Sequence, residues 1–454
     1  MNIKILFSGL IVFIFSPSNI LFGQCDNIII NYQSEIDNFA IQYPGCTEIS
    51  GIFKIEETVA GNITNLNGLS QINKVKNLLI FNNSSLTNLN GLNNITAISN
   101  DVSYGRLQII NNASLVNIDA LENIQEILQQ IMIVGNPQLT SINGLHNVSI
   151  THPDLGITIE ENPLLQNLLG LNQITLAKYL SLQNNDMLIN LNGLNNLTEL
   201  GRLTIAANQN LINCEGLNNL VTVGGDFGID ISGNPSLESF DGFESLVSSS
   251  RFHLAENTAV TSVEGFSSLT SSLNGFGIGN SPLLTSLSGL ENLTNVFLLY
   301  LEGNDLLNDI SALSNVNINT PLYELVIQGS PELAICDYPN ICQYLNNPSN
   351  IAYIYDNAPG CNSREEVLQA CGLLNINDTN TADNFSIHPN PTKEIFTISG
   401  IDNGTIQITD SQGRILKTFT LGKDETSLEG LSEGVYFINI TNEKGSVTKQ
   451  LIKI

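Results

Sequence analysis

Few residues of this 454-residue chain have the types and spacing that metal binding or catalysis needs. The four histidines have neither metal-ligand spacing nor an H-E-x-x-H neighbourhood; they are His146, His152, His253 and His388. The acidic residues form no D-x-D-x-D-G calcium loop. We therefore expect no metal and no cofactor, with a bound Ca²⁺ as an alternative to which no residues can be assigned.

Two short motifs match the sequence patterns of catalytic or phosphate-binding loops. The sequence GLSEG at Gly430–Gly434 matches the nucleophile elbow of serine hydrolases, but it lacks a strand–turn–helix context. The sequence GFGIG at Gly275–Gly279 is glycine-rich, but it takes a strand position and no helix follows, so it is not a phosphate loop. The chain is therefore predicted to be non-catalytic, and a secreted hydrolase is the less favoured alternative.

The seven cysteines lie mostly towards the ends of the chain. Cys214 takes a position that Leu or Ile fills elsewhere, which predicts a buried thiol. The other six are disulfide candidates, as expected of an exported protein: Cys25, Cys46, Cys336, Cys342, Cys361 and Cys371. We expect a Cys25–Cys46 bridge. The last four cysteines allow three pairings, and a zinc site is disfavoured because close C-x-x-C pairs are missing.

One phrase, LSLQNNDMLINLNGLNNL at residues 180–197, organises the middle of the chain. It recurs in eleven copies spaced by 23 to 29 residues, which is typical of a solenoid. Each copy holds one L-x-I strand whose alternate side chains point inward. The fold class is therefore predicted to be a mainly β solenoid of right-handed parallel β-helix or leucine-rich-repeat-like coils, with disulfide caps. The solenoid covers residues 51–330, between caps at 24–50 and 331–372.

An asparagine follows most of the strands. Its amide is expected to satisfy backbone groups of its own and the adjoining coil rather than to bind a ligand. This predicted ladder comprises Asn83, Asn112, Asn136, Asn162, Asn185, Asn208, Asn234, Asn257 and Asn304, with Ser281 and Ser330 in two coils.

Residues that do not recur are the better candidates for binding. The outward strand positions of later coils, such as Ser181, Thr204 and Asp230, are what solvent exposure would produce. The early coils instead carry apolar residues, and exposed apolar surface marks interaction sites. The predicted ligand face is Leu79, Phe81, Gln108, Ile110, Met132 and Val134. The alternative is that the insertion at 100–105 or the N-terminal cap covers this face.

The two ends of the chain differ in character from the repeats. Residues 1–23 are predicted to be a signal peptide, with Lys4 before an apolar run that is too short to be a membrane anchor. Residues 373–384 are a polar linker, and residues 385–454 alternate like a small immunoglobulin-like antiparallel β-sandwich. After signal cleavage no transmembrane segment is expected. The formal charge of −27 argues against nucleic acid and against anionic membranes.

Two resemblances follow from these residues. The repeats GNPQLTSINGL (135–145) and GNPSLESFDGF (233–243), with the cysteine caps, resemble the receptor L-domain family, a leucine-rich-repeat-like solenoid found in ligand-binding ectodomains. The tail resembles the type A C-terminal sorting domain of the type IX secretion system. The matching residues are Pro389, Asn390, Pro391, Gly434, Tyr436, Lys449 and Lys453.

The second resemblance implies contact with the type IX secretion machinery, export through the periplasm, removal of the tail, and release or attachment to the outer cell surface. Together the two resemblances imply an exported binding or adhesion protein with a protein or polysaccharide ligand. A structural or self-associating surface protein is the alternative.

Overall fold

The computed structural model describes residues 24–99, 105–149, 152–318, 324–373, 386–400, 404–410, 413–421, 426–442 and 445–454. The predicted signal peptide lies outside the described residues, and so does the predicted linker except for Leu373. The chain divides into two compact units, residues 1–374 and 375–454.

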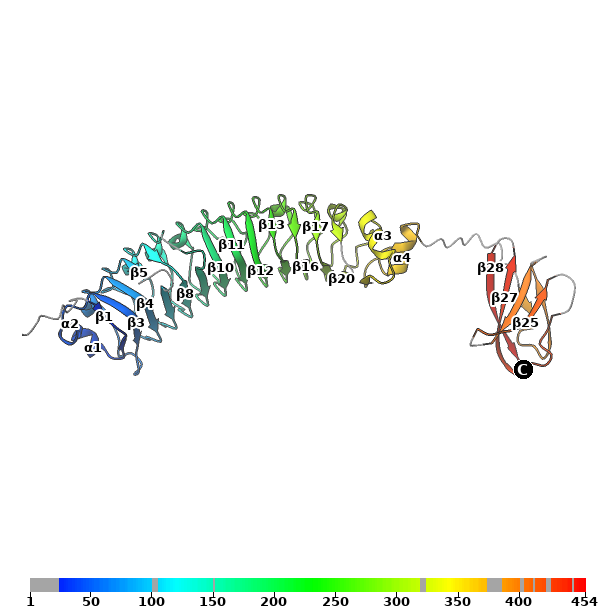
Figure 1. The fold of residues 1–454 in the computed structure, drawn as a ribbon, viewed down its shortest axis with the longest axis horizontal. Helices are drawn as coiled ribbons and strands as arrows, with labels where there is room; N and C mark the ends of the chain where they lie inside the picture. Colours follow the sequence, from blue (N-terminus) through cyan, green and yellow to red (C-terminus); the bar gives the residue numbers. More distant parts are fainter. Residues whose placement is uncertain are drawn as a thin grey trace, which may run out of the picture. The chain divides into compact units, whose positions relative to one another are not determined.

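The first unit is a curved stack of coils built on parallel strands (Figure 1). One strand of each coil joins a continuous parallel sheet, here called the main sheet. Its strands are β2 (Ile28–Ile30), β3 (Glu48–Glu56), β4 (Lys74–Phe81), β6 (Arg106–Ile110), β8 (Gln130–Val134), β9 (Gly156–Glu160), β10 (Leu176–Gln183), β11 (Glu199–Ala206), β12 (Thr222–Ser232), β14 (Phe252–Ala255), β16 (Phe276–Gly279), β18 (Leu299–Glu302), β20 (Glu324–Gln328) and β21 (Ile351–Tyr355).

Many coils carry a second, shorter strand that the repeat phrase did not predict. These strands pair in parallel with one another or with the first residues of the long strands β3, β4 and β12. They are β1 (Gln24–Cys25), β5 (Ala97–Ile98), β7 (Glu126–Ile127), β13 (Ser248–Ser249), β15 (Ser271–Ser272), β17 (Asn295–Val296) and β19 (Asn317–Ile318). Short 3₁₀ turns stand at several x-G-L, x-A-L or x-G-F steps: η1 (Asn67–Leu69), η2 (Asp119–Leu121), η3 (Asn143–Leu145), η4 (Leu169–Leu171), η5 (Glu264–Phe266) and η6 (Ser311–Leu313).

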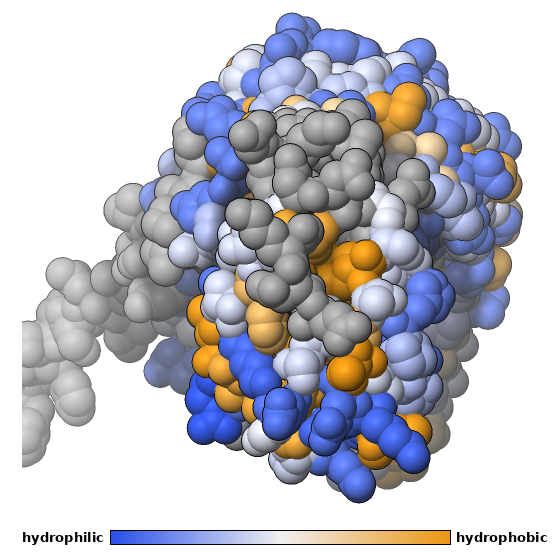
Figure 2. Space-filling view, turned by 90° about the vertical axis from the view of Figure 1, so that its right-hand side faces the viewer, coloured by the Kyte–Doolittle hydropathy of each residue, from blue (hydrophilic) through white to orange (hydrophobic). Residues whose placement is uncertain are grey.

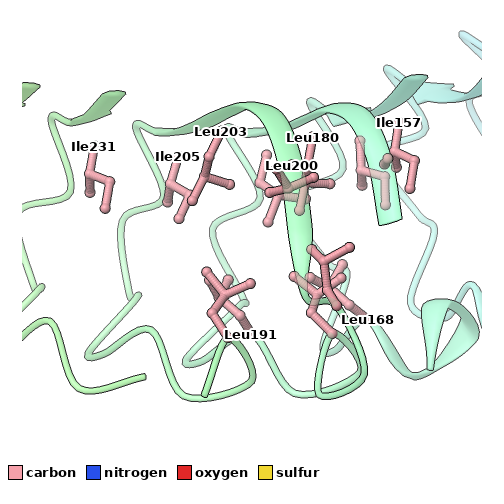
Figure 3. Packing of buried hydrophobic residues seen from close by; sticks show 14 of the residues in the cluster. Ile157, Leu168, Leu180, Leu191, Leu200, Leu203, Ile205 and Ile231 are labelled. Atoms are coloured by element: carbon pink, nitrogen blue, oxygen red, sulfur yellow. The ribbon is translucent and has the colours of Figure 1, made fainter. Parts of the chain in front are cut away.

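The apolar residues of the repeat phrase fill the interior of the stack. Leu180 and Leu203 of the main sheet face Leu168 and Leu191, which come from the opposite side of their coils (Figure 3). All four side chains are at most 1% exposed. Burying a leucine of this size contributes about 1.5–3 kcal/mol, so the recurring letters account for much of the stability of the stack. The predicted fold class is confirmed.

The caps contain more strand than predicted. At the N-terminus, α1 (Gln33–Asp37) and α2 (Phe39–Gln42) cover the first coil with Phe39 fully buried, but β2 already belongs to the main sheet. At the C-terminus, β21 extends the main sheet between α3 (Pro339–Leu345) and α4 (Arg364–Ala370). Disulfides join Cys25 to Cys46, Cys336 to Cys361 and Cys342 to Cys371. The structure thus selects one of the three C-terminal pairings, and Cys214 is a buried free thiol.

The second unit is a small antiparallel sandwich, as the sequence predicts. Three strands form one sheet: β22 (Ser386–His388), β23 (Ile395–Ser399) and β26 (Thr426–Ser427). Four strands form the other: β25 (Ile415–Thr420), β24 (Thr405–Thr409), β27 (Gly434–Asn442) and β28 (Gly445–Lys453). Phe396, Ile408, Ile438 and Leu451 are fully buried between them. On the face that Figure 2 displays, apolar residues lie interspersed with hydrophilic ones.

Candidate binding surface

The recurrent asparagines lie inside the stack, each at most 1% exposed. Asn208 shows the pattern. Its Nδ2 donates to the Leu182 carbonyl oxygen of the preceding coil at 3.1 Å, and its Oδ1 accepts from the Asn185 backbone N–H at 3.0 Å. The side chain thereby satisfies backbone groups that leave the sheet at the turn. Residues engaged in this way are not available to a ligand.

Two residues that the repeat pattern did not reveal occupy the ends of this ladder. At the first coil, the Glu57 backbone N–H donates to Asn83 Oδ1 at 3.2 Å, and the Glu57 carboxylate accepts from the N–H groups of Gly61 and Ile63. Burial raises the pKa of Glu57, but hydrogen bonds from Ser84, Gly61 and Ile63 outweigh it and hold the pKa below its ordinary value.

Asn357 closes the other end of the ladder. Its Oδ1 accepts from the Ser330 N–H at 3.0 Å, and its Nδ2 donates to the carbonyl oxygens of Ile327 and Cys361. The sequence does place an asparagine two residues after β21. This strand lies within the predicted C-terminal cap, where no repeat strand is expected.

The predicted ligand face is brought together on three neighbouring strands, β4, β6 and β8. Leu79, Gln108 and Met132 are aligned across the strands, and so are Phe81, Ile110 and Val134. All six side chains are half-buried. The Lys54 ammonium lies 5.6 Å from the centre of the Phe81 ring, which extends this surface onto β3. Residues 100–104 of the insertion lie outside the described residues, so its covering role stays a prediction.

A more strongly hollowed surface lies on the later coils, which the sequence alone did not single out. We call it the aromatic hollow; it has a volume of about 630 Å³ and spans β9 to β12. This volume lies within the usual range for small-molecule sites, about 300–1,000 Å³. The polar and aromatic residues that line it are Glu160, Lys178, Tyr179, Ser181, Gln183, Arg202, Thr204, Asp226 and Phe227.

An insertion in β12 builds one wall of the aromatic hollow. Val223 pairs with Leu200 and Gly228 pairs with Arg202, so residues 224–227 interrupt the register where β11 has only Gly201. Phe227 at the end of this bulge is 61% exposed, and the Arg202 guanidinium carbon lies 4.9 Å from the centre of its ring. A guanidinium so placed is attracted to the ring face and holds it in position.

Tyr179 of β10 forms the opposite wall. A Cβ on Gly156 would collide with the Tyr179 ring, so the ring lies across that glycine. Its hydroxyl reaches β8, where it accepts from Gln130 Nε2 at 3.4 Å. Gly156 is therefore glycine because the Tyr179 ring packs on it, and the alternating pattern of a strand does not predict this contact.

The floor of the aromatic hollow is a polar network. Glu160 Oε1 accepts from the Ser181 hydroxyl at 2.6 Å and from Gln183 Nε2 at 2.9 Å. Gln183 Nε2 also donates to Ser181 Oγ at 2.8 Å. Polar atoms between two aromatic walls suit a ligand that has both apolar faces and hydroxyl groups.

A second hollow lies over β16, and we call it the glycine trough. It has a volume of about 450 Å³, and its floor is the backbone of Gly277 and Gly279. His253 of β14 and Tyr300 of β18 stand on either side of it. The GFGIG motif is therefore a strand, as predicted, but a strand whose outward positions carry no side chain.

One ion pair borders the glycine trough. His253 Nδ1 lies 3.3 Å from Asp230 Oδ1 on the neighbouring strand β12. The hydrogen bond with His253 outweighs burial and lowers the pKa of the Asp230 carboxyl. No serine, threonine or cysteine accompanies this pair among the side chains that line the trough, so the arrangement fixes the imidazole ring rather than forming a triad.

The other histidines are not among the residues that line the two hollows. His146 Nδ1 lies 2.8 Å from the Asn143 carbonyl oxygen, His152 Nδ1 lies 3.5 Å from Asp154 Oδ2, and His388 lies in β22. Ser432 of the GLSEG motif precedes β27, and its carbonyl oxygen accepts from the Tyr436 hydroxyl at 2.6 Å. Within the ranges that the structure describes, no three His, Cys, Asp or Glu side chains gather so as to hold a metal ion.

Comparison with known proteins agrees with both resemblances. Residues 45–151 match the family model of the receptor L domain, and residues 386–454 match that of the secretion system C-terminal sorting domain. The chain carries a receptor L domain and a C-terminal sorting domain. None of the curated proteins matches the chain. The sorting domain indicates export and either attachment to the cell surface or secretion. No helix in the described part of the chain combines the length and apolarity needed to cross a membrane.

Several of the predicted sorting residues hold the second unit together. Asn390, between Pro389 and Pro391, donates from Nδ2 to the Gln450 carbonyl oxygen at 2.8 Å and accepts at Oδ1 from the Ile452 N–H at 3.0 Å. Lys453 Nζ donates to the carbonyl oxygens of Leu428 and Leu431 at 3.1 and 2.7 Å. Gly434 and Tyr436 lie in β27, and Lys449 lies opposite Ile438 in β28. The motif thus positions the last strand against the start of the sorting domain.

Proposed function

We propose that the chain is an exported, non-catalytic binding protein that holds a polysaccharide on the open face of the main sheet. The observation that carries this proposal is the aromatic hollow, in which Tyr179 and Phe227 flank a floor of hydroxyl, amide and carboxylate groups. Sugar rings have apolar faces that stack on aromatic side chains and hydroxyl groups that such a floor can bind. The sorting domain supports the proposal because it indicates export to the place where extracellular polysaccharides are found.

The hydrogen bonds of Glu160 in the aromatic hollow support a non-catalytic role. Glycoside hydrolysis needs two carboxyl groups facing each other across the scissile bond. Glu160 is tied to Ser181 and Gln183 on the floor of the aromatic hollow, where these bonds fix it as a hydrogen-bond acceptor. Incubation of the chain with polysaccharides should release no shorter oligosaccharides, and release of reducing ends would establish the hydrolase alternative.

The test is retention of the mature chain, from residue 24 onward, on immobilised neutral and acidic polysaccharides. Removing the exposed ring in Phe227→Ala should weaken retention about 5- to 150-fold, on the scale of the about 1–3 kcal/mol that a nucleic-acid base gains by stacking on one aromatic side chain. Tyr353→Ala is the matched control, since Tyr353 is an exposed aromatic residue of the last main-sheet strand, far along the sheet from the hollow. Retention of no polysaccharide, or equal retention of both variants, would contradict the proposal.

A second candidate function, self-association on the cell surface, is favoured by the apolar side chains of β4, β6 and β8. Phe81, Ile110 and Met132 leave a half-buried apolar surface on three adjacent strands. If this surface joins two copies, the wild-type chain should sediment as a dimer and the Phe81→Ser, Met132→Ser variant as a monomer. A monomeric wild type at high concentration would exclude this role.

A further inference from the structure

Strand β16 is unusual in the main sheet because both of its outward positions are glycine. Gly277 and Gly279 alternate with the buried residues Phe276 and Ile278, and they pair with side-chain-bearing residues of β14 and β18. Glycine weakens a strand interior because it is flexible when unfolded and has no side chain to pack. A reason for two glycines must therefore be sought either in the fold or in what the strand binds.

The fold does not demand these glycines. A Cβ on Gly277 would lie 3.5 Å from Tyr300 Cβ and 3.8 Å from His253 Cδ2, and one on Gly279 would lie 3.4 Å from the Glu302 carbonyl oxygen. These are ordinary contact distances, and neither residue has a positive φ. Gly144 of the repeat phrase differs, because a Cβ there would collide with the Ile118 carbonyl oxygen of the preceding coil.

What the two glycines provide is space. The glycine trough has the Tyr300 ring on one side and the His253 ring, oriented by Asp230, on the other. Its border carries three carboxylates, Glu256, Glu302 and Glu324, against the single guanidinium of Arg251. Such a border repels anions and offers acceptors to hydroxyl groups.

The trough also lies within reach of the aromatic hollow. From β11 the main sheet continues through β12 and β14 to β16, which is three strand spacings, or about 14 Å. An extended chain that crosses the strands can therefore occupy both hollows at once, and binding at one raises the effective concentration at the other.

We propose that the glycine trough is a subsite for one sugar ring of an uncharged polysaccharide, and that Gly277 and Gly279 determine its specificity by leaving room for that ring. This inference rests on the proposed function. It adds the charge class of the ligand, the position of a second subsite, and the two residues whose lack of side chains creates it.

The test fills the trough without disturbing the fold. The double variant Gly277→Ala, Gly279→Ala should melt at the same temperature as the wild type or higher, because a Cβ at either position meets only ordinary contact distances and glycine is a weak strand former. Its affinity for a neutral polysaccharide that the wild type retains should fall about 10- to 200-fold, the usual effect of extra carbon in a fitted site. Ala206→Val is the matched control, since it adds carbon on the same face outside the lining of either hollow. Tyr300→Ala, which removes a wall instead of filling the space, should also weaken binding.

The outcomes separate the two proposals. If the wild type binds neutral polysaccharide, Phe227→Ala weakens binding, and both the filled-trough variant and Tyr300→Ala bind like the wild type, the trough is not a subsite and the proposed function stands. If the wild type retains no polysaccharide, the proposed function fails and this inference fails with it. Tighter retention of acidic than of neutral polysaccharides would overturn the assigned charge class. If the filled-trough variant does not fold, the glycines serve the fold, and the specificity role assigned to them is wrong.

Discussion

Replacing Asn208 by alanine tests whether the asparagine ladder stabilises the stack. The side chain is 1% exposed and bridges two coils. Without it, the Asn185 N–H loses the acceptor that lies 3.0 Å away, and the Leu182 carbonyl oxygen loses a donor at 3.1 Å. The Ala206 carbonyl oxygen is less affected, because it also accepts from the Asn184 N–H.

The magnitude follows from these two backbone groups. A buried donor or acceptor left without its partner costs about 1–3 kcal/mol, so with two such groups the variant should lose about 2–6 kcal/mol of unfolding free energy. This loss is large against the total stability of about 5–15 kcal/mol that is usual for a domain. Because each coil contacts only its neighbours, the effect should concentrate in the coils next to residue 208 rather than spread over the unit.

Hydrogen exchange with urea unfolding is the assay, and Gln209→Ala is the control, because Gln209 is an exposed amide on the same turn. The amide of Asn185 should exchange faster in the Asn208 variant, and peptides from distant coils should change less. An Asn208→Ala variant that unfolds within about 0.5 kcal/mol of Gln209→Ala, the range of ordinary surface substitutions, would refute the structural role of the ladder.

Three further predictions concern the caps and the core. The pKa of Glu57 is held below its ordinary value, so its carboxylate stabilises the fold above about pH 4.3 and this contribution is lost as the pH falls through the lowered folded-state pKa. Glu57→Gln should therefore flatten the acid limb of melting temperature against pH, and an unchanged limb would contradict the assignment. The Cys342→Ser, Cys371→Ser variant opens a loop with a separation of 29 residues and should lose about 3–4 kcal/mol, measured by urea unfolding. Burial first, and then the negative charges of Asp241 and Glu244, raise the pKa of the Cys214 thiol, so a thiol reagent should label it only after unfolding.

Periodicity in the sequence predicts those residues that have the same structural role in every coil. Leu180 and Asn208 could be assigned to core and ladder because the same letter returns at the same step, and the structure places both inside the stack. Glu57 and Asn357 each complete the hydrogen bonds at one end of the asparagine ladder, outside the repeated phrase, so no periodicity points to them. The short strands that extend beside the main sheet, such as β13 with its two serines, have no apolar pattern that would distinguish them from loops.

The two hollows were harder to predict because each depends on what a neighbouring coil lacks. Phe227 reads as part of a glycine-rich insertion, and only the register between β11 and β12 shows that it projects beside Arg202. Gly277 reads as a weak strand residue, and only its separation from Tyr300 and His253 shows that the missing side chain is not required by packing. One sequence alone gives the residue types, but it does not give the strand register or the distances between side chains of neighbouring coils.

Rigidity connects the ladder to the proposed binding surface. The backbone that supports Tyr179, Arg202 and Tyr300 is held on its inner side by leucines and on its turn by buried amides such as Asn208. A surface fixed in this way loses little conformational entropy when a ligand binds. The recurring residues thus affect binding by fixing the distance between the two hollows. Asn208 lines neither hollow. Asn208→Ala should therefore weaken retention of a long polysaccharide more than retention of a single sugar unit.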